Sequence, residues 1–295
     1  MMKRLNHLLS WTVVGLLIVL SVVPLRVLLL FSPVLSFFVG QVFGYRRAVI
    51  TTNLRRSFPE KEEREIGRLR SAFYLHVADV FFETVSLFLA PRAAIRRRCV
   101  ADAAGKALLD SFSRDGKTVV CLAAHLGNWE THLPAYMDYT LSRPFAVYRP
   151  LADRPADWFL ATIRRRFCAG IIPDRQVART LARMKNDAVP AAIGLVSDQS
   201  PGNQDLVWLD FMHQDTAFYA GPEKLIRMFG LPALFMYSRK VARGHYKVHI
   251  DLIAEDPAAL PEGEITRRYV ALIEREIHRN PVHYLWSHRR WKKKR

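Results

Sequence analysis

The chain has 295 residues, half of them hydrophobic, and carries 44 lysines and arginines against 27 aspartates and glutamates, a formal net charge of +17. A chain this apolar can bury a sizeable core, which excludes wholesale disorder, and three widely spaced cysteines without a CxxC pair argue against a disulfide scaffold or a zinc module. The positive charge is typical of proteins that meet an anionic partner, such as lipid headgroups, a phosphorylated substrate, nucleic acid or an acidic protein.

The first 45 residues are strongly apolar. Residues 8–25 and 27–45 contain no formal charge and are separated by Arg26. A membrane span needs roughly 20 apolar residues, so we expect one span at about residues 8–25, followed by an apolar helix that lies against the membrane or re-enters it. This predicts a membrane anchor over residues 1–45. The alternatives are a buried helical hairpin and a cleaved signal peptide, although no A-x-A cleavage site follows.

Basic residues are more frequent after this segment than before it. Lys3 and Arg4 precede it, and five arginines accompany its later part: Arg26, Arg46, Arg47, Arg55 and Arg56. Because positive charge stays on the cytoplasmic side, the bias predicts that residues 46–95 and the rest of the chain lie in the cytoplasm.

The remainder of the chain has the pattern of an α/β domain. Residues 46–95 are predicted to be helical. From about residue 118, short β-rich runs alternate with helical segments, which indicates a sheet with helices on its faces. The expected strands are 118–124, 145–148, 171–172, 191–196, 233–237 and an edge strand at 246–253. The expected helices are 157–167, 176–185, 222–229 and 264–278.

The stretch CLAAHLGNWE carries the most chemical information. His125 follows the expected strand 118–124, and ligands bind at the carboxyl ends of strands in open α/β sheets. Gly127 and Asn128 supply a tight turn and a helix start, so Glu130 falls in the first turn, close enough to fold back on the imidazole. A carboxylate on one ring nitrogen would fix the tautomer, and the other nitrogen could remove a proton from a substrate hydroxyl.

Other interpretations of these residues remain open at this point. A histidine at a strand end is often purely structural, and a metal site completed by His132 is a third interpretation, although no HExxH motif is present. Residues 116–118 resemble a P-loop fragment but precede the strand instead of following it. The sequence contains no recognised nucleic-acid-binding module, so nucleic acid is not an expected partner. A non-enzymatic membrane scaffold would make His125 and Glu130 dispensable.

The sequence resembles the late lipid A acyltransferase family, the lauroyl and myristoyl transferases of Gram-negative envelopes. HLGNWE at residues 125–130 is similar to that family's form of the HX4(D/E) acyltransferase motif. Further similarity lies in NLRRSFP at 53–59, YRP at 148–150, SDQ at 197–199 and WSHRRWK at 286–292. The resemblance implies a glycerophosphate-acyltransferase-like α/β fold, a mixed sheet flanked by helices with an N-terminal membrane helix, and an acyltransferase domain over residues 46–295.

The resemblance also implies an activity in glycolipid and lipopolysaccharide biosynthesis. The enzyme would lie in the bacterial inner membrane and face the cytoplasm. It would move a fatty acyl chain from a thioester, usually of acyl-carrier protein and otherwise of coenzyme A, to a hydroxyl of a lipid A precursor, an acylated glucosamine-disaccharide phosphate. No cofactor or metal is implied. Matched position by position, the family's site residues are the base His125, its partner Glu130, the YRP arginine Arg149, a later arginine at Arg164, and Asp198.

Chemical reasoning adds expected roles to these matches. Fixed guanidinium groups hold phosphate, and Arg149 and Arg164 are expected to point toward the same edge of the sheet. Asn128, through the turn that it forms with Gly127, is expected among the residues that contact substrate. Residues 211–221 lack an early glycine that the family pattern has, so acyl length and acceptor stay open. An acyltransferase for a lysophospholipid, a phosphatidylinositol mannoside or an amino-acid lipid is the alternative.

Overall fold

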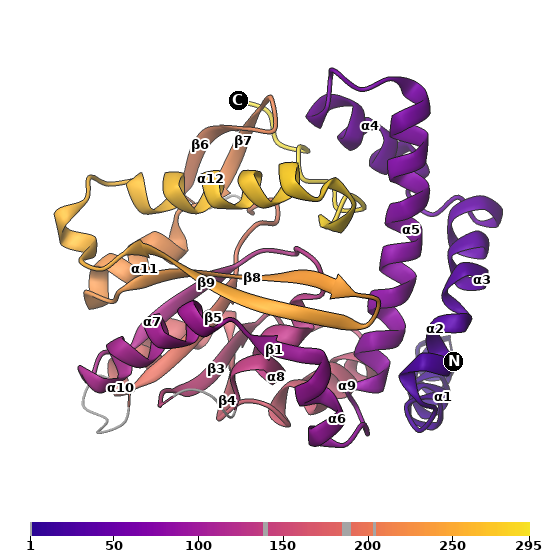
Figure 1. Cartoon of the computed structure of the whole chain (residues 1–295), viewed down its shortest axis with the longest axis horizontal. Helices are drawn as coiled ribbons and strands as arrows, with labels where there is room; N and C mark the ends of the chain where they lie inside the picture. The colour runs from indigo at the N-terminus through magenta and orange to yellow at the C-terminus, as the bar shows by residue number, and fades with distance from the viewer. Residues whose placement is uncertain (1, 138–140, 185–189, 203–204) are drawn as a thin grey trace.

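The computed structural model describes residues 2–137, 141–184, 190–202 and 205–295 (Figure 1). Within these residues, the centre of the fold is a sheet of seven strands in the order β1-β9-β8-β2-β5-β3-β4. Neighbouring strands are parallel except for the antiparallel pair β8 and β9, so the sheet is mixed, as expected. The strands are β1 (Cys99–Ala101), β2 (Val119–Ala123), β3 (Arg143–Tyr148), β4 (Gly170–Pro173), β5 (Ala191–Val196), β8 (Ala233–Ala242) and β9 (His245–Ala254).

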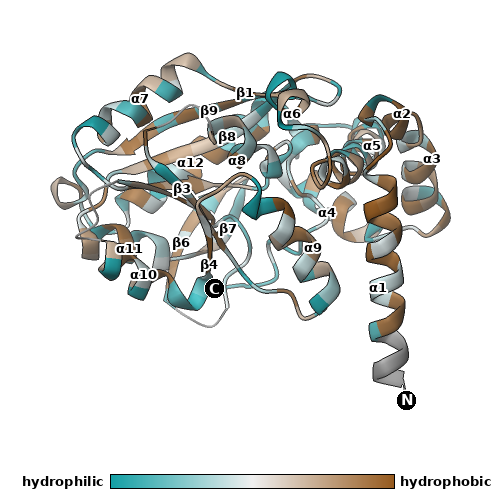
Figure 2. Cartoon of the chain, turned by 90° about the horizontal axis from the view of Figure 1, so that it is seen from below, coloured by the Kyte–Doolittle hydropathy of each residue, from teal (hydrophilic) through white to brown (hydrophobic). Residues whose placement is uncertain are grey.

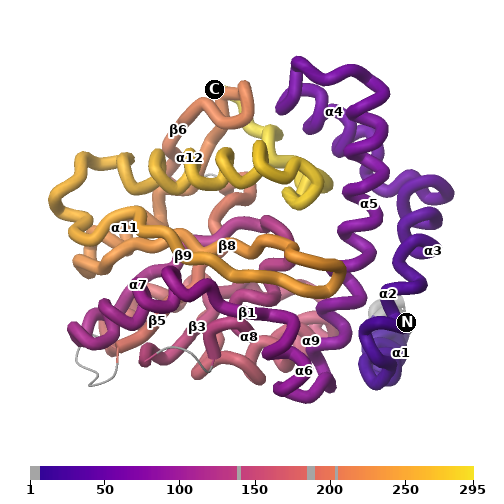
Figure 3. Tube along the Cα trace, in the orientation of Figure 1, coloured from indigo at the N-terminus to yellow at the C-terminus, as the bar shows by residue number. Residues whose placement is uncertain are grey.

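Both faces of the sheet are covered by helices, because side chains of the buried central strands alternate between two hydrophobic clusters. Leu122 of β2 packs in one cluster with Ile273 of α12, and Cys121 packs in the other with Phe112 of α7 and Phe159 of α9. Figure 3 shows α12 on one side of the sheet and α7, α8 and α9 on the opposite side. These helices are α7 (Ala103–Arg114), α8 (His132–Tyr136), α9 (Arg154–Arg165) and α12 (Glu264–Arg279).

Of the other helices, three agree with the helical expectation for residues 46–95, and two correspond to the helices expected at 176–185 and 222–229. They are α4 (Arg47–Ser57), α5 (Glu63–Ser86), α6 (Arg92–Arg98), α10 (Val177–Met184) and α11 (Gly221–Phe229). Residue 185, the expected end of the helix at 176–185, lies outside the described residues.

The N-terminal segment does not form the expected membrane-spanning helix. Its first helix, α1 (Met2–Leu20), ends before Pro24, and the chain continues in α2 (Leu25–Leu30), α3 (Ser32–Phe37) and a π-helical turn at Phe38–Val42. The part of α1 without formal charge, residues 5–20, is about 24 Å long at ~1.5 Å per residue, whereas the hydrocarbon core of a bilayer is about 30 Å thick. In the described part of the chain, no helix has both the length and the apolar character needed to span a membrane. The predicted membrane helix is therefore wrong, because the prediction counted apolar residues across the break before Pro24.

The helices α1 to α3 lie beside α5, on its side away from the sheet (Figure 1), and Figure 2 shows α1 extending from the body of the fold. Val14 of α1 is buried in the α7–α9 cluster, and Leu28 and Leu29 of α2 pack on Phe82 of α5. Many other apolar side chains between residues 8 and 45 are exposed. We call them the N-terminal apolar surface, and its most exposed members include Leu8, Leu16, Val19, Val22, Leu30 and Phe43.

Two strand pairings differ from the expectations. The strand predicted at 246–253 as an edge is internal, because the short strand β1 pairs along its outer side. A separate hairpin, β6 (Leu206–Phe211) and β7 (Gln214–Tyr219), was not expected. Its turn places Met212 and His213 at φ of 53° and 61°, a conformation that Asn-Gly pairs usually mark, so the sequence carried no turn signal.

Candidate active site

His125 and Asp198 meet at the carboxyl edge of the sheet. Strands β2 and β5 are parallel neighbours in which Ala123 pairs with Val196, and each functional residue follows its strand at the same distance. The imidazole Nδ1 lies 2.7 Å from the Oδ1 of Asp198. The side chain of Asp198 is buried, and that of His125 retains 16% exposure. Strand register thus brings together two residues that are 73 positions apart in the chain.

The environment of Asp198 keeps its carboxyl ionised. Burial alone would raise the pKa of Asp198, but the hydrogen bond and charge of His125, together with the positive charge of Arg290, outweigh burial and lower it. An ionised Asp198 accepts a hydrogen bond from Nδ1–H, which leaves Nε2 as the basic nitrogen of the imidazole. Nε2 lies 3.4 Å from the amide nitrogen of Gln199, and the ring packs edge-on against Trp129.

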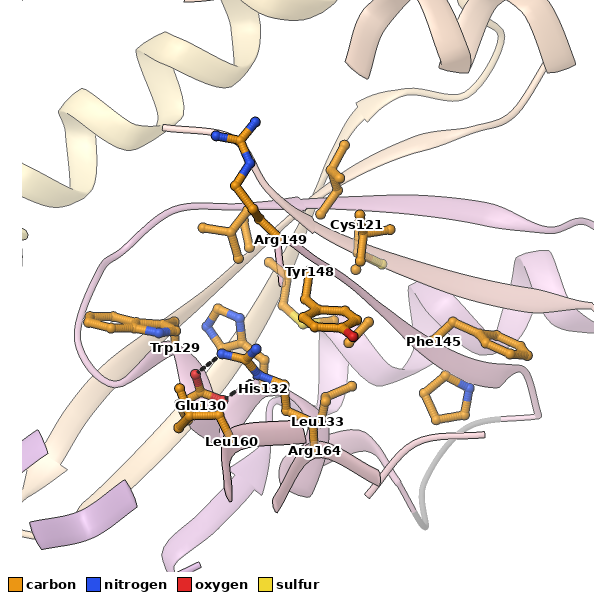
Figure 4. A pocket seen from close by; sticks show the side chains of 18 of the residues that line it. Cys121, Trp129, Glu130, His132, Leu133, Phe145, Tyr148, Arg149, Leu160 and Arg164 are labelled. Carbon is orange, nitrogen blue, oxygen red and sulfur yellow. Dashed lines mark hydrogen bonds and ion pairs between the residues drawn. The ribbon is translucent and has the colours of Figure 1, made fainter. Parts of the chain in front are cut away.

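Glu130 does not contact the imidazole as expected. It lies in a 3₁₀ turn, Trp129–Thr131, which directs its carboxylate toward α9. There Arg164 donates through both Nε, at 3.1 Å, and Nη2, at 2.5 Å (Figure 4). The structure therefore corrects the pairing inferred from the sequence: Asp198 is the partner of His125, and Glu130 is the partner of Arg164.

The structure also shows which of the three consecutive arginines at the end of α9, Arg164 to Arg166, faces the cavity. Arg164 lines the cavity beside His125, Arg165 is exposed, and Arg166 donates to the backbone carbonyls of Phe88 and Ala90. Burial lowers the pKa of Arg164, but the carboxylate of Glu130 more than compensates, so the pKa of Arg164 is raised. The Arg164 guanidinium therefore stays charged at the cavity wall.

Glu130→Gln is expected to lower the free energy of unfolding by about 3 kcal/mol, because it leaves the mostly buried Arg164 cation without its counter-charge. Denaturant unfolding of the purified protein measures this. A matched control is Glu63→Gln, which removes the exposed partner of Arg55 and should change stability little. Equal stability of the Glu130→Gln variant and the wild type would contradict the structural role of the pair.

Asn128 is buried and does not line the cavity, contrary to its expected contact with substrate. Its Nδ2 donates to Glu83 Oε2 at 2.9 Å, and its Oδ1 accepts from the backbone N–H of Glu130. Burial raises the pKa of Glu83, which also accepts a hydrogen bond from Tyr246. Glu83 therefore anchors the loop from inside α5, and its only signal in the sequence was a carboxylate within an apolar helix.

The backbone between His125 and Glu130 is held from several sides. The N–H of Gly127 donates to the carbonyl of His283, and its carbonyl contacts Nε2 of His76, whose pKa burial lowers to about 3. Gly127 has φ of 59°, and a Cβ there would lie 2.7 Å from the Ser238 carbonyl oxygen. Glycine is therefore the residue that fits this position, and these contacts hold the loop that carries His125.

Arg149 lies at the end of β3 and lines the same cavity as Arg164, but the two guanidinium groups are separately paired. Arg149 Nε donates to Asp174 Oδ2 at 3.0 Å, and the Arg149 side chain is 86% exposed. In Figure 4 it extends away from the Glu130–Arg164 pair. Both arginines therefore line one cavity, as expected, but their guanidinium groups do not converge on one point within it.

An apolar cavity of about 450 Å³ opens beside His125. It lies between one face of the sheet and helices α7, α8 and α9. Small residues on the sheet face leave the space, and larger side chains of the helices close it. The lining includes Ala123, Ala146, Ala192 and Gly194 from the strands and Leu133, Tyr136 and Leu160 from the helices. Its size and hydrocarbon walls fit a flexible apolar ligand.

On a mixed α/β sheet, a histidine–aspartate pair lies beside an apolar cavity, an arrangement suited to proton transfer next to an apolar ligand. The profile of the bacterial lipid A biosynthesis acyltransferase family matches residues 2–293, nearly the whole chain, and the protein belongs to this family. It is therefore an acyltransferase of lipid A biosynthesis. A search of curated proteins finds no match to the chain.

Proposed function

We propose that the protein transfers a fatty acyl chain from an acyl thioester to a hydroxyl of a lipid A precursor. The observation that supports this most strongly is the His125–Asp198 pair at the mouth of the apolar cavity. The acyl chain lies in the cavity, which places the thioester carbonyl beside Nε2 of the imidazole.

In the transfer step, Nε2 of His125 removes the proton from the acceptor hydroxyl as its oxygen attacks the thioester carbonyl carbon. Asp198 stabilises the imidazolium that forms. The carbon–oxygen ester bond forms, the carbon–sulfur bond breaks, and the imidazolium returns its proton to the leaving thiolate. Both products are then neutral at the reacting atoms, and no cofactor takes part in the step.

Arg164 is the candidate donor for the oxygen that gains negative charge. It lines the cavity, and Glu130 occupies its Nε and one Nη, which leaves further N–H groups of the guanidinium for the substrate. In this role Glu130 is a positioning residue for Arg164. The backbone N–H of Gly127, the other candidate, already donates to His283.

The donor is proposed to be the thioester of acyl-carrier protein. Such a carrier is strongly acidic, and the net charge of +17 supports its electrostatic attraction to this protein. Coenzyme A thioesters share the reacting group but lack the acidic protein surface. The two donors therefore differ in how strongly salt should weaken their productive encounter.

We further propose that the enzyme works at the cytoplasmic face of the bacterial inner membrane. The six most exposed members named for the N-terminal apolar surface are 64% to 75% exposed, and basic residues such as Arg46 and Arg47 adjoin it. Apolar side chains next to arginines suit the boundary between acyl chains and anionic headgroups. Acceptor lipid in that leaflet would reach the site without leaving the membrane.

The experiment is an assay of purified protein with acyl-carrier and coenzyme A thioesters and separate acceptors, followed by mass spectrometry. The acceptors are a lipid A precursor, a lysophospholipid, a phosphatidylinositol mannoside and an amino-acid lipid. We expect one added acyl mass on the lipid A precursor, at a higher rate with the carrier thioester. Transfer only to another acceptor would overturn the proposed acceptor.

Gly194→Val is expected to shorten the acyl chain that the enzyme accepts. A Cβ at Gly194 would meet no atom closer than the Phe145 carbonyl oxygen at 3.5 Å, so the backbone tolerates it and the side chain fills the cavity. Excluding two methylenes at about 0.8 kcal/mol each lowers kcat/KM for the preferred thioester about 15-fold. The kcat/KM for a thioester two carbons shorter should stay near the wild-type value.

The measurement is kcat/KM across a series of thioester lengths. Gly67→Val is the control, because Gly67 lies on α5 with open space around its Cβ and does not line the cavity. An unchanged length profile in Gly194→Val would contradict the assignment of this cavity to the acyl chain.

A further inference from the structure

A second cavity, of about 400 Å³, opens at the same edge of the sheet as the acyl cavity. It lies at the ends of β3 and β5, beside the start of α10 and the start of α11. The two cavities share six lining residues at their junction: Val147, Tyr148, Arg149, Leu195, Val196 and Gln199. They therefore meet beside the imidazole, because the amide of Gln199 lies 3.4 Å from Nε2 of His125.

The walls of the second cavity differ chemically from those of the first. Two guanidinium groups, of Arg149 and Arg175, contribute to it, together with the hydroxyl-bearing residues Ser197, Ser200 and Tyr219. Asp174 accepts from Nε of Arg149 and from the backbone N–H of Arg175. Because a guanidinium has five N–H donors, the pairing of Arg149 through Nε leaves donors for an anion. A lining of this kind suits a hydroxyl-rich ligand that carries phosphate.

Acyl transfer requires two substrates to reach the same imidazole nitrogen. The acyl chain fills the first cavity, so the acceptor hydroxyl has to approach Nε2 from another direction. The second cavity provides that approach past Gln199. We propose that the second cavity binds the phosphorylated sugar headgroup of the acceptor, with Arg149 and Arg175 on its phosphate and Gln199 beside the reacting hydroxyl. This inference rests on the proposed function and names the place of its second substrate.

Arg175→Gln is the sharpest test, because Arg175 lines the second cavity and not the first. Arg179→Gln is the matched control, since Arg179 is an exposed arginine of α10, four residues further along the chain, and lines neither cavity. We expect Arg175→Gln to raise KM for the phosphorylated acceptor about tenfold or more, as for a lost hydrogen bond to a charged group. KM for the thioester, and thioester hydrolysis without acceptor, should stay unchanged.

A dephosphorylated acceptor provides the second arm of the test. With it, the difference between Arg175→Gln and the wild type should disappear. Equal effects of Arg175→Gln and Arg179→Gln, or an Arg175→Gln effect that persists without phosphate, would overturn the proposal.

A binding measurement separates this proposal from the proposed function. Phosphorylated glucosamine disaccharide is titrated into His125→Ala protein and into the same protein with Arg175→Gln added. Weaker binding in the second protein supports the headgroup cavity even if no transfer to lipid A precursor is found. Transfer by the wild type with no effect of Arg175 on binding or KM would overturn the cavity and leave the proposed function intact.

Discussion

His125→Ala is expected to lower kcat for acyl transfer by about 10²–10⁴-fold, the usual contribution of a positioned general base. KM for the thioester should change little, because residues other than His125 form most of the lining of the cavity that holds the acyl chain. The loop around the site should keep its conformation, since Gly127, Asn128 and Glu83 hold it independently of the imidazole.

Steady-state rates of purified His125→Ala and wild type measure this, with circular dichroism to confirm the fold. His245→Ala is a suitable control, because His245 is exposed at the start of β9 and lines neither cavity. Wild-type activity in His125→Ala would refute the role of this residue as the base.

Asp198→Asn is expected to lower kcat by about 10²-fold or more, with the fold intact. An asparagine amide can donate to Nδ1, which would favour the tautomer that carries its proton on Nε2, the wrong nitrogen for a base. The variant also removes the charge that stabilises the imidazolium. Because the substrates contact neither oxygen of Asp198 in this account, the loss should appear in kcat and much less in KM.

Comparison with Glu130→Gln distinguishes the two carboxylates. Glu130 is separated from the imidazole by its pairing with Arg164, so its replacement should act through Arg164 and through stability. Asp210→Asn, at an exposed position of β6, serves as the neutral control. If Glu130→Gln altered the pH profile of kcat while Asp198→Asn left it unchanged, the assignment of Asp198 as the partner would be wrong.

Local patterns in the sequence placed His125 at the edge of the sheet but did not predict that Asp198 contacts it. The run TVVCLAA predicts β2, and a residue that directly follows a parallel strand lies at the ligand-binding edge, so His125 could be placed from nearby residues alone. The contact of Asp198 with His125 requires β5 to lie next to β2, and the order of strands in the sheet cannot be read from local sequence patterns. The direction of Glu130 depends on the 3₁₀ turn at Trp129–Thr131, which a spacing rule for α-helices does not capture.

The errors at the N-terminus have a similar origin. By hydropathy, residues 8–45 form a nearly continuous apolar segment. The length of each helix is instead set by breaks in the helical backbone, such as the one before Pro24. Asn128 illustrates the reverse case. Its residue type correctly suggested a turn, and its Oδ1 does accept from the backbone of Glu130, but burial against Glu83 is a tertiary property. Spacing therefore predicted helices, strands and the position of His125, and tertiary packing decided which side chains meet.

The central claim is that Asp198 holds Nδ1–H of His125 and leaves Nε2 free to accept a proton. Nitrogen-15 NMR of protein labelled at histidine, recorded at alkaline pH, measures this directly. The His125 resonances are assigned by their loss in His125→Ala. We predict the protonated shift at Nδ1 and the unprotonated shift at Nε2, with the preference lost in Asp198→Asn. A proton on Nε2 in the wild type would contradict the claim.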